Sequence, residues 1–122
     1  MTSSTGRGSI DNRKEPRYPV TWRARLTLPG GQIREVRVQD ISENGVGLLC
    51  DEPIQNRVTL NVVLGVPDID DPAHVLAVPV QITVAYVVLQ NHSFRVGGAW
   101  AGLHVSARDL LNAWIRRLSF QD

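Results

Sequence analysis

The chain has 122 residues, 43% of them hydrophobic, a length that fits one domain and excludes two. Its single cysteine, Cys50, rules out an internal disulfide, so we expect a reducing cytoplasm rather than a disulfide-stapled secreted fold. The formal net charge is only +1, but residues 1–37 hold eight Lys and Arg against three Asp and Glu, which makes this segment the place to look for an anionic partner.

The first 17 residues are predicted to lie outside the regular structure. Residues 1–12 are rich in Ser, Thr and Gly and predict a flexible tail. Residues 13–17, RKEPR, contain Pro16, which disfavours an interior helix, so we expect an extended or turn-like arm. The first twenty residues contain no apolar run, and no stretch approaches the ~20 apolar residues that span a bilayer, so we expect neither a signal peptide nor membrane insertion.

A β-hairpin is predicted directly after this arm. From Val20 to Leu28 apolar and polar residues alternate, which is typical of a strand with one solvated face. Pro29-Gly30-Gly31 predicts a turn, and residues 32–39 form the expected return strand. Because Ile33 is out of phase with the apolar residues that follow it, we expect a β-bulge in this strand.

The remainder of the chain predicts more strands and one helix. Four further apolar segments have the length of strands: Val46–Cys50, Val58–Leu64, Val75–Leu89 and Phe94–Trp100. Pro79 indicates an edge position or a bulge within its strand. In residues 107–119 the apolar period changes from two to about 3.6, and Ser106 with Asp109 resembles a capping box. Six or seven antiparallel strands followed by a C-terminal amphipathic α-helix predict a mainly β fold, a small β-barrel.

Residues that commonly carry catalysis or bind metals lack the spacing that these sites require. Three histidines show no metal-ligand spacing with one another or with Cys50: His74, His92 and His104. An acidic cluster lacks the glycine and the terminal glutamate of a calcium loop: Asp68, Asp70 and Asp71. No phosphate loop, dinucleotide fingerprint or nucleophile elbow is present. We therefore expect no enzyme, no metal and no resident cofactor.

Two motifs lie one hairpin apart. The first is an R-x-x-x-R pair, Arg13 and Arg17, and the second is a D-x-S-x-x-G turn with Asp40, Ser42 and Gly45. Because a hairpin returns the chain to near its starting point, the turn is expected beside the base of the arm. Two guanidinium groups can fork onto phosphate oxygens or guanine O6 and N7, whereas a carboxylate and a hydroxyl can accept from the Watson–Crick edge of guanine. A glycine lets the backbone approach a ligand closely. Together the motifs fit a phosphorylated guanine ligand.

Each motif alone also has a purely structural interpretation. A charged arm near a chain terminus is commonly only solvated. Asp40 and Ser42 can stabilise a tight turn through their own side chains, and Asn44-Gly45 is a common turn dipeptide. The functional interpretation depends on the motifs occurring together, at hairpin spacing, in a chain that predicts a β-barrel.

With these motifs the chain resembles a PilZ domain, the bacterial receptor for the second messenger cyclic di-GMP (c-di-GMP). The resemblance extends over about residues 12–119 and includes the strand pattern, a late strand ending in GGAW, and the closing helix. It implies one PilZ-like domain over residues 13–119. It also implies that Arg13 and Arg17 hold guanine and phosphate, and that Asp40 and Ser42 contact the guanine edge.

The resemblance assigns four further positions. Gly45 matches the glycine of the turn motif, and Lys14 is expected to add a phosphate contact. Tyr86 stands where some members of the family place an aromatic residue that stacks on a guanine. Asn12 occupies a position that is linked in the family to binding one messenger molecule or a stacked pair, and asparagine matches neither of the residue types found there.

The expected function is that of a cytoplasmic receptor without enzymatic activity. It binds c-di-GMP, changes the conformation of its arginine arm and signals in trans to an unidentified protein. Two alternatives stay open. One is a barrel that binds single-stranded nucleic acid through stacking aromatics, although the small net charge and the inward-facing Trp22 argue against it. The arginines that it would use lie on the first hairpin: Arg23, Arg25, Arg34 and Arg37. The other is a protein-interaction domain that binds no ligand.

Overall fold

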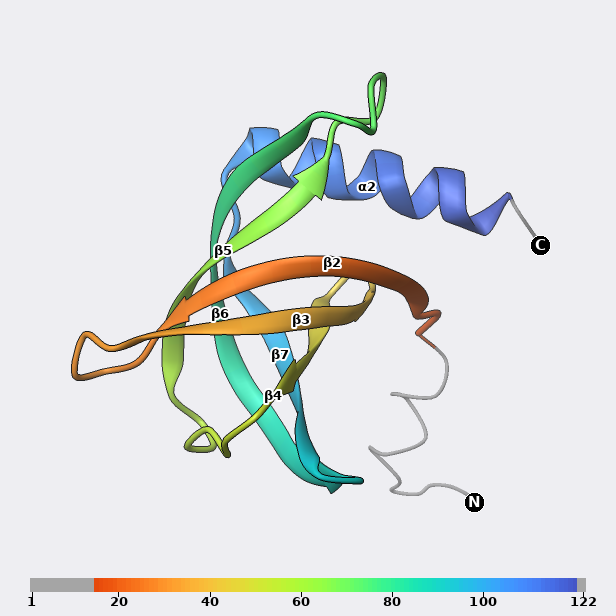
Figure 1. The fold of residues 1–122 in the computed structure, drawn as a ribbon. Coiled ribbons are helices and arrows are strands. Elements are labelled where there is room, and N and C mark those ends of the chain that lie inside the picture. The colour runs from red at the N-terminus through yellow and green to blue at the C-terminus, as the bar shows by residue number, and fades with distance from the viewer. Residues whose placement is uncertain (1–14, 121–122) are drawn as a thin grey trace, which may run out of the picture.

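The strands of the protein form a closed antiparallel barrel in the computed structural model, which describes residues 15–120. Around the barrel the order is β2-β3-β4-β7-β6-β5, and β5 pairs again with β2 (Figure 1). The strands are β2 (Tyr18–Thr27), β3 (Ile33–Ile41), β4 (Gly45–Cys50), β5 (Thr59–Pro67), β6 (Val75–Gln90) and β7 (Ser93–Gly102). The predicted mainly β barrel is therefore confirmed, and each predicted strand is present within three residues of its expected bounds.

Branched aliphatic side chains fill the barrel because the strands alternate as predicted. In β2, Trp22, Ala24 and Leu26 are buried, whereas Arg23 and Arg25 between them are exposed. The other strands contribute fully buried residues to the same cluster: Ile41, Leu48, Leu60, Leu64, Ile82 and Val96. Burying one such side chain stabilises the fold by about 1.5–3 kcal/mol, so this cluster stabilises the strands that carry the outward-facing residues.

Helix α2 (Val105–Ser119) lies across one end of the barrel (Figure 1). Its residues Ala107 and Leu111 are buried. The ring of Trp114 meets that of Trp22 edge to face, with centroids 5.9 Å apart, and its indole N–H donates to the carbonyl of Pro67 at 2.7 Å. The helix therefore contacts both β2 and the end of β5.

The start of α2 differs from the prediction. A helix from residue 107 with a Ser106–Asp109 capping box was expected, but the helix begins at Val105 and His104 is its N-cap. The imidazole Nδ1 of His104 accepts from the backbone N–H of Ser106 at 3.2 Å. Since the helix begins before Ser106, this serine lies within the first turn and is not the N-cap. The capping-box prediction is therefore wrong.

The strand pairing tests two further predictions about the sheet. The bulge predicted for the return strand is present in β3 but not at Ile33, because this exposed residue pairs with Thr27 in regular register. The register of β3 shifts instead between Val38 and Asp40, where β3 pairs with β4. The edge position expected for Pro79 is confirmed, since β7 pairs with β6 only from Gln81 onward.

Candidate functional site

Four residues from four neighbouring strands form a row on the outer face of the barrel. Asp40 of β3 pairs with Gly47 of β4, Gly47 pairs with Gly97 of β7, and Gly97 pairs with Tyr86 of β6. A register shift stands beside each end of the row, between Val38 and Asp40 and between Val84 and Tyr86. Bulges re-aim side chains and are frequent next to binding sites. An acid and an aromatic ring thus flank two glycines.

The side chain of Arg95 spans this row from the acid to the ring. Its Nη1 lies 2.9 Å from Asp40 Oδ2, and its Nη2 donates to Asp40 Oδ1 at 3.3 Å. Its Nε donates to the hydroxyl of Tyr86 at 3.1 Å, and Nη1 also donates to Gln39 Oε1 at 3.0 Å. Burial alone would lower the pKa of Arg95, but the hydrogen bonds with Asp40 and Tyr86 and the charge of Asp40 raise it above its ordinary value. Arg95 therefore stays positively charged, and these contacts hold its guanidinium in place.

The glycines of the row make room for these side chains. A Cβ on Gly97 would contact the ring of Tyr86, and a Cβ on Gly47 would stand 2.5 Å from Asp40 Oδ1 and 2.7 Å from both Nη atoms of Arg95. The ring and the guanidinium consequently lie close against the sheet, held by hydrogen bonds on one side and by backbone on the other.

The base of the N-terminal arm meets the turn between β3 and β4. Arg17 Nη1 lies 3.5 Å from Asp40 Oδ1, and the backbone N–H of Asn44 donates to Glu15 Oε2 at 3.0 Å. The carbonyl of Asn44 in turn accepts from the backbone N–H of Trp100 at 3.0 Å. The arm, the turn and β7 are therefore linked at one place.

Ser42 shapes the turn itself. Its hydroxyl accepts from the backbone N–H of Gly45 at 3.1 Å and donates to the carbonyl of Gly45 at 3.3 Å. Ser42 is buried, but one lone pair of its oxygen is left for a further donor. Gly45 is needed for packing, because a Cβ there would contact the backbone carbonyl of Gly98. This reason differs from the close ligand approach that the sequence suggested for the glycine.

A pocket of about 330 Å³ opens between the arm, the turn and the row. Arg17, Ser42, Gly45 and Tyr86 line it, and Asp40 lies beside it in contact with Arg17. The structure therefore brings together five of the seven predicted site residues. The other two, Arg13 and Lys14, lie outside the described residues.

The sequence patterns did not indicate three participants: Glu15, Gln39 and Arg95. Glu15 stands inside the R-x-x-x-R motif, at a position that the motif leaves unspecified. Gln39 directly precedes the motif acid. Arg95 comes two residues before Gly97-Gly98 on a strand whose exposed positions are small, and this isolated long cation next to two glycines was the available signal.

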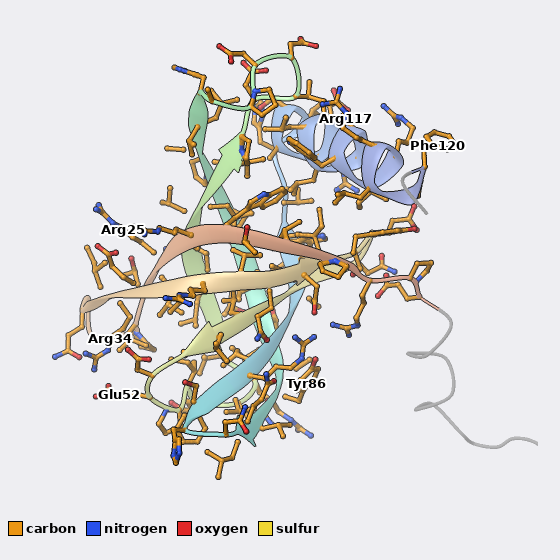
Figure 2. The ribbon with its side chains drawn as sticks, turned by 45° about the vertical axis from the view of Figure 1, so that its right-hand side comes forward. Arg25, Arg34, Glu52, Tyr86, Arg117 and Phe120 are labelled. Carbon is orange, nitrogen blue, oxygen red and sulfur yellow. The ribbon has the colours of Figure 1, made fainter. Side chains whose placement is uncertain are left out.

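The arginines of the first hairpin belong to a different surface. Figure 2 shows Arg25 and Arg34 on one side of the barrel and Tyr86 on the other. Arg25 pairs with Glu35 at 3.6 Å, and Arg34 Nη2 lies 2.9 Å from Glu52. Trp22 is buried against α2, so its ring does not offer a stacking surface beside these arginines.

The described residues, 15–120, contain neither a metal-binding cluster nor a membrane-spanning helix. Within residues 15–120 no group of three His, Cys, Asp or Glu side chains could hold a metal ion. Between these same residues there is no helix of the length and apolar character needed to cross a membrane.

Comparison with protein families decides what this site belongs to. Residues 11–117 match the family model of the PilZ domain, and this range contains both motifs, the whole barrel and most of α2. The chain belongs to the PilZ domain family. PilZ domains are receptors and not enzymes, so membership agrees with the absence of catalytic motifs in the sequence. No curated protein matches the chain.

Solved structures with the same fold come from several bacteria. The inhibitor of motility MotI/DgrA of Bacillus subtilis is 12% identical, with a TM-score of 0.72 over 90% of this chain and 53% of its own. The MrkH–c-di-GMP complex of K. pneumonia is 16% identical, with a TM-score of 0.74 over 89% and 53%. The PilZ domain of Escherichia coli YcgR with c-di-GMP is 13% identical, with a TM-score of 0.67 over 89% and 92%. This PilZ chain spans about half the length of the first two.

Proposed function

We propose that this PilZ domain is a receptor that binds c-di-GMP in the pocket between the arginine arm and the turn motif. The observation that carries the proposal is the 3.5 Å ion pair between Arg17 and Asp40, which joins the two motifs at one pocket. Had the turn stood on the far side of the barrel from the arm, no shared site would exist. The MrkH and YcgR structures, which contain c-di-GMP, support the choice of ligand.

Each expected residue has a chemical task in this proposal. Arg13 and Arg17, with Lys14, hold the phosphates and the O6 and N7 edge of guanine. Asp40 accepts from guanine N1–H and the exocyclic amine, and the free lone pair of Ser42 accepts a further donor. The ring of Tyr86 offers a face on which a base can stack, and such stacking contributes about 1–3 kcal/mol per base.

Isothermal titration calorimetry with c-di-GMP tests the proposal and also returns the stoichiometry, which Asn12 leaves open. Charge-assisted hydrogen bonds contribute about 1.5–3 kcal/mol each, so Arg13→Ala, Arg17→Ala and Asp40→Ala should each raise Kd by about 10- to 140-fold. Arg23→Ala is the matched control, because Arg23 is an exposed arginine that does not line the pocket, and it should leave Kd unchanged. Cyclic di-AMP, which lacks the 2-amino group and the O6 acceptor, should bind far more weakly. Absence of binding at tens of micromolar c-di-GMP would refute the receptor function.

Signalling is the second part of the proposal. We infer that the segment from Arg13 to Arg17 closes over the bound nucleotide and presents a new surface to a partner protein in the cytoplasm. Hydrogen exchange should then slow in peptides covering residues 10–18 when c-di-GMP is added. Unchanged exchange in this segment, with binding intact, would contradict the closing arm while leaving the receptor function in place. A partner that binds equally well with and without the messenger would favour a plain protein-interaction domain.

A further inference from the structure

Arg95 joins the two ends of the nucleotide site, although it belongs to neither of the family's two motifs. It is one of only two cations seen within 4.0 Å of Asp40 in the part of the chain that the structure describes. Its side chain is 20% exposed and that of Asp40 is 16% exposed, whereas that of Arg17 is 36% exposed. The Arg95–Asp40 pair is thus the shorter and the more shielded of the two, and the Arg17–Asp40 pair is the one that a ligand can more readily displace.

The donors of Arg95 are almost fully used by the protein. A guanidinium has five N–H groups. The Nε–H donates to Tyr86, one Nη1–H lies on Asp40 Oδ2 and the other on Gln39, and one Nη2–H donates to Asp40 Oδ1. Only one N–H of this side chain is left. An arginine that binds phosphate needs a free fork, so this arrangement favours a role in fixing neighbouring side chains.

The acceptors of Asp40 show what this fixing achieves. A carboxylate has about four lone-pair sites, two on each oxygen. Arg95 occupies one site on each oxygen, and Arg17 Nη1 lies 3.5 Å from Oδ1 in an ion pair. If Arg17 turns to a ligand phosphate, Oδ1 is released while Arg95 still holds the carboxylate. The released oxygen can then accept from the guanine edge, whose donors are N1–H and 2-NH₂.

We propose that Arg95 is a positioning residue for the nucleotide site, setting the orientation of Asp40 for the guanine edge and holding the Tyr86 ring against Gly97 at the same time. This inference rests on the proposed function. One guanidinium couples the hydrogen-bonding and the stacking part of the pocket, so both lose their geometry when it is removed. Arg95 makes both contacts across the row of paired residues Asp40, Gly47, Gly97 and Tyr86.

A double-mutant cycle in c-di-GMP affinity tests the role. Arg95→Met keeps the aliphatic stem and removes all donors, and it should raise Kd by at least tenfold. In the Asp40→Asn, Tyr86→Ala background, where both positioned groups are already lost, the same change should raise Kd by less than threefold. Arg95→Lys keeps the charge but not the fork, and it should recover only a minor part of the loss. Arg23→Met is the matched control and should stay within twofold of the wild type.

The outcomes separate the two proposals. If the wild type binds and Arg95→Met binds equally well, the positioning role is overturned while the receptor function stands. If Arg95→Met costs the same factor in both backgrounds, Arg95 acts on the ligand directly and the positioning role is again overturned. If the wild type itself does not bind, the receptor function fails and Arg95 has no ligand to serve.

A second variant covers the case in which Arg95→Met does not fold. Tyr86→Phe removes only the hydroxyl that accepts from Arg95 Nε and keeps the stacking ring. It should abolish the protected Arg95 Nε–H signal in ¹⁵N-edited spectra of the ligand-free protein and weaken c-di-GMP binding several-fold. Full affinity in Tyr86→Phe together with loss of that signal would overturn the inference.

Discussion

Adding a single methyl group at Gly97 should separate ligand binding from stability in this PilZ domain. In Gly97→Ala the new Cβ would occupy the place of the Tyr86 ring, which therefore has to swing away from the sheet. The backbone of Gly97 does not require glycine, since Gly31 is the only glycine with positive φ among the described residues. The substitution thus acts on the ring and not on the chain conformation.

The magnitudes follow from what the methyl group meets. The obstacle at Gly97 is a half-buried side chain that can rotate into solvent, so we expect a stability loss of about 1 kcal/mol or less, at the low end for an overpacked site. At Gly45 the obstacle is the backbone carbonyl of Gly98, which cannot rotate away, so Gly45→Ala should cost about 1–3 kcal/mol. For binding, loss of one stacked base at about 1–3 kcal/mol predicts a Kd increase of about 5- to 140-fold in Gly97→Ala.

Urea denaturation and calorimetric titration with c-di-GMP measure the two quantities on the same samples. In the Tyr86→Ala background, Gly97→Ala should add no further loss of affinity, because the ring it displaces is already gone. A Gly97→Ala protein that binds as tightly as the wild type would show that the ring need not lie against the sheet. A Gly97→Ala protein as unstable as Gly45→Ala would show that the ring cannot move.

Three further predictions concern the barrel and its helix. Leu111→Ala should lower the free energy of unfolding by about 2–5 kcal/mol in urea, because this leucine is a buried contact of α2 with the barrel. Trp114→Phe leaves the carbonyl of Pro67 without its donor and should cost about 1–3 kcal/mol in the same assay. Burial, followed by the charge of Asp51, raises the pKa of Cys50 from 9.0 to about 11, so a thiol reagent should modify the native protein at pH 8 only after unfolding. Because the folded pKa of Cys50 is the higher one, its contribution to stability is present below pH 9 and lost between pH 9 and about pH 11, a loss that Cys50→Ala should not show.

Local patterns were sufficient to predict the barrel and the meeting of the arginine arm with the turn motif. Alternation in β2 and the turn at Pro29–Gly31 fix a hairpin, and a hairpin brings its two ends together, which is why the sequence alone predicts that Arg17 and Asp40 lie near each other. The helix start was missed because a histidine cap has no strong sequence signature, whereas the Ser106–Asp109 spacing imitates a capping box.

The contacts of Arg95 depend on strand neighbours that are distant in sequence. Arg95 reaches Asp40 only because β4 and β7 pair, across 55 residues of chain, and no periodicity within one strand reports that pairing. The bulge was predicted for the correct strand, but its place beside Asp40 could not be, since a change of phase in the apolar pattern shows that a strand is irregular without showing where the register shifts. Contacts of this kind become predictable once the strand order is known.

Asn44 links the arm to β7 through the hydrogen bonds of its N–H and its carbonyl. Its N–H is held by Glu15, two residues before Arg17, and its carbonyl is held by Trp100 of β7. If a ligand draws Arg17 from Asp40 and Glu15 moves with the arm, Asn44 loses the partner of its N–H, and an exposed backbone N–H released in this way can turn to water at little cost. The 3.0 Å bond from Trp100 keeps the other side of the turn in place. In the proposed receptor the turn therefore stays attached to β7 while the arm rearranges around the nucleotide, and Asp40, held by Arg95, keeps its position.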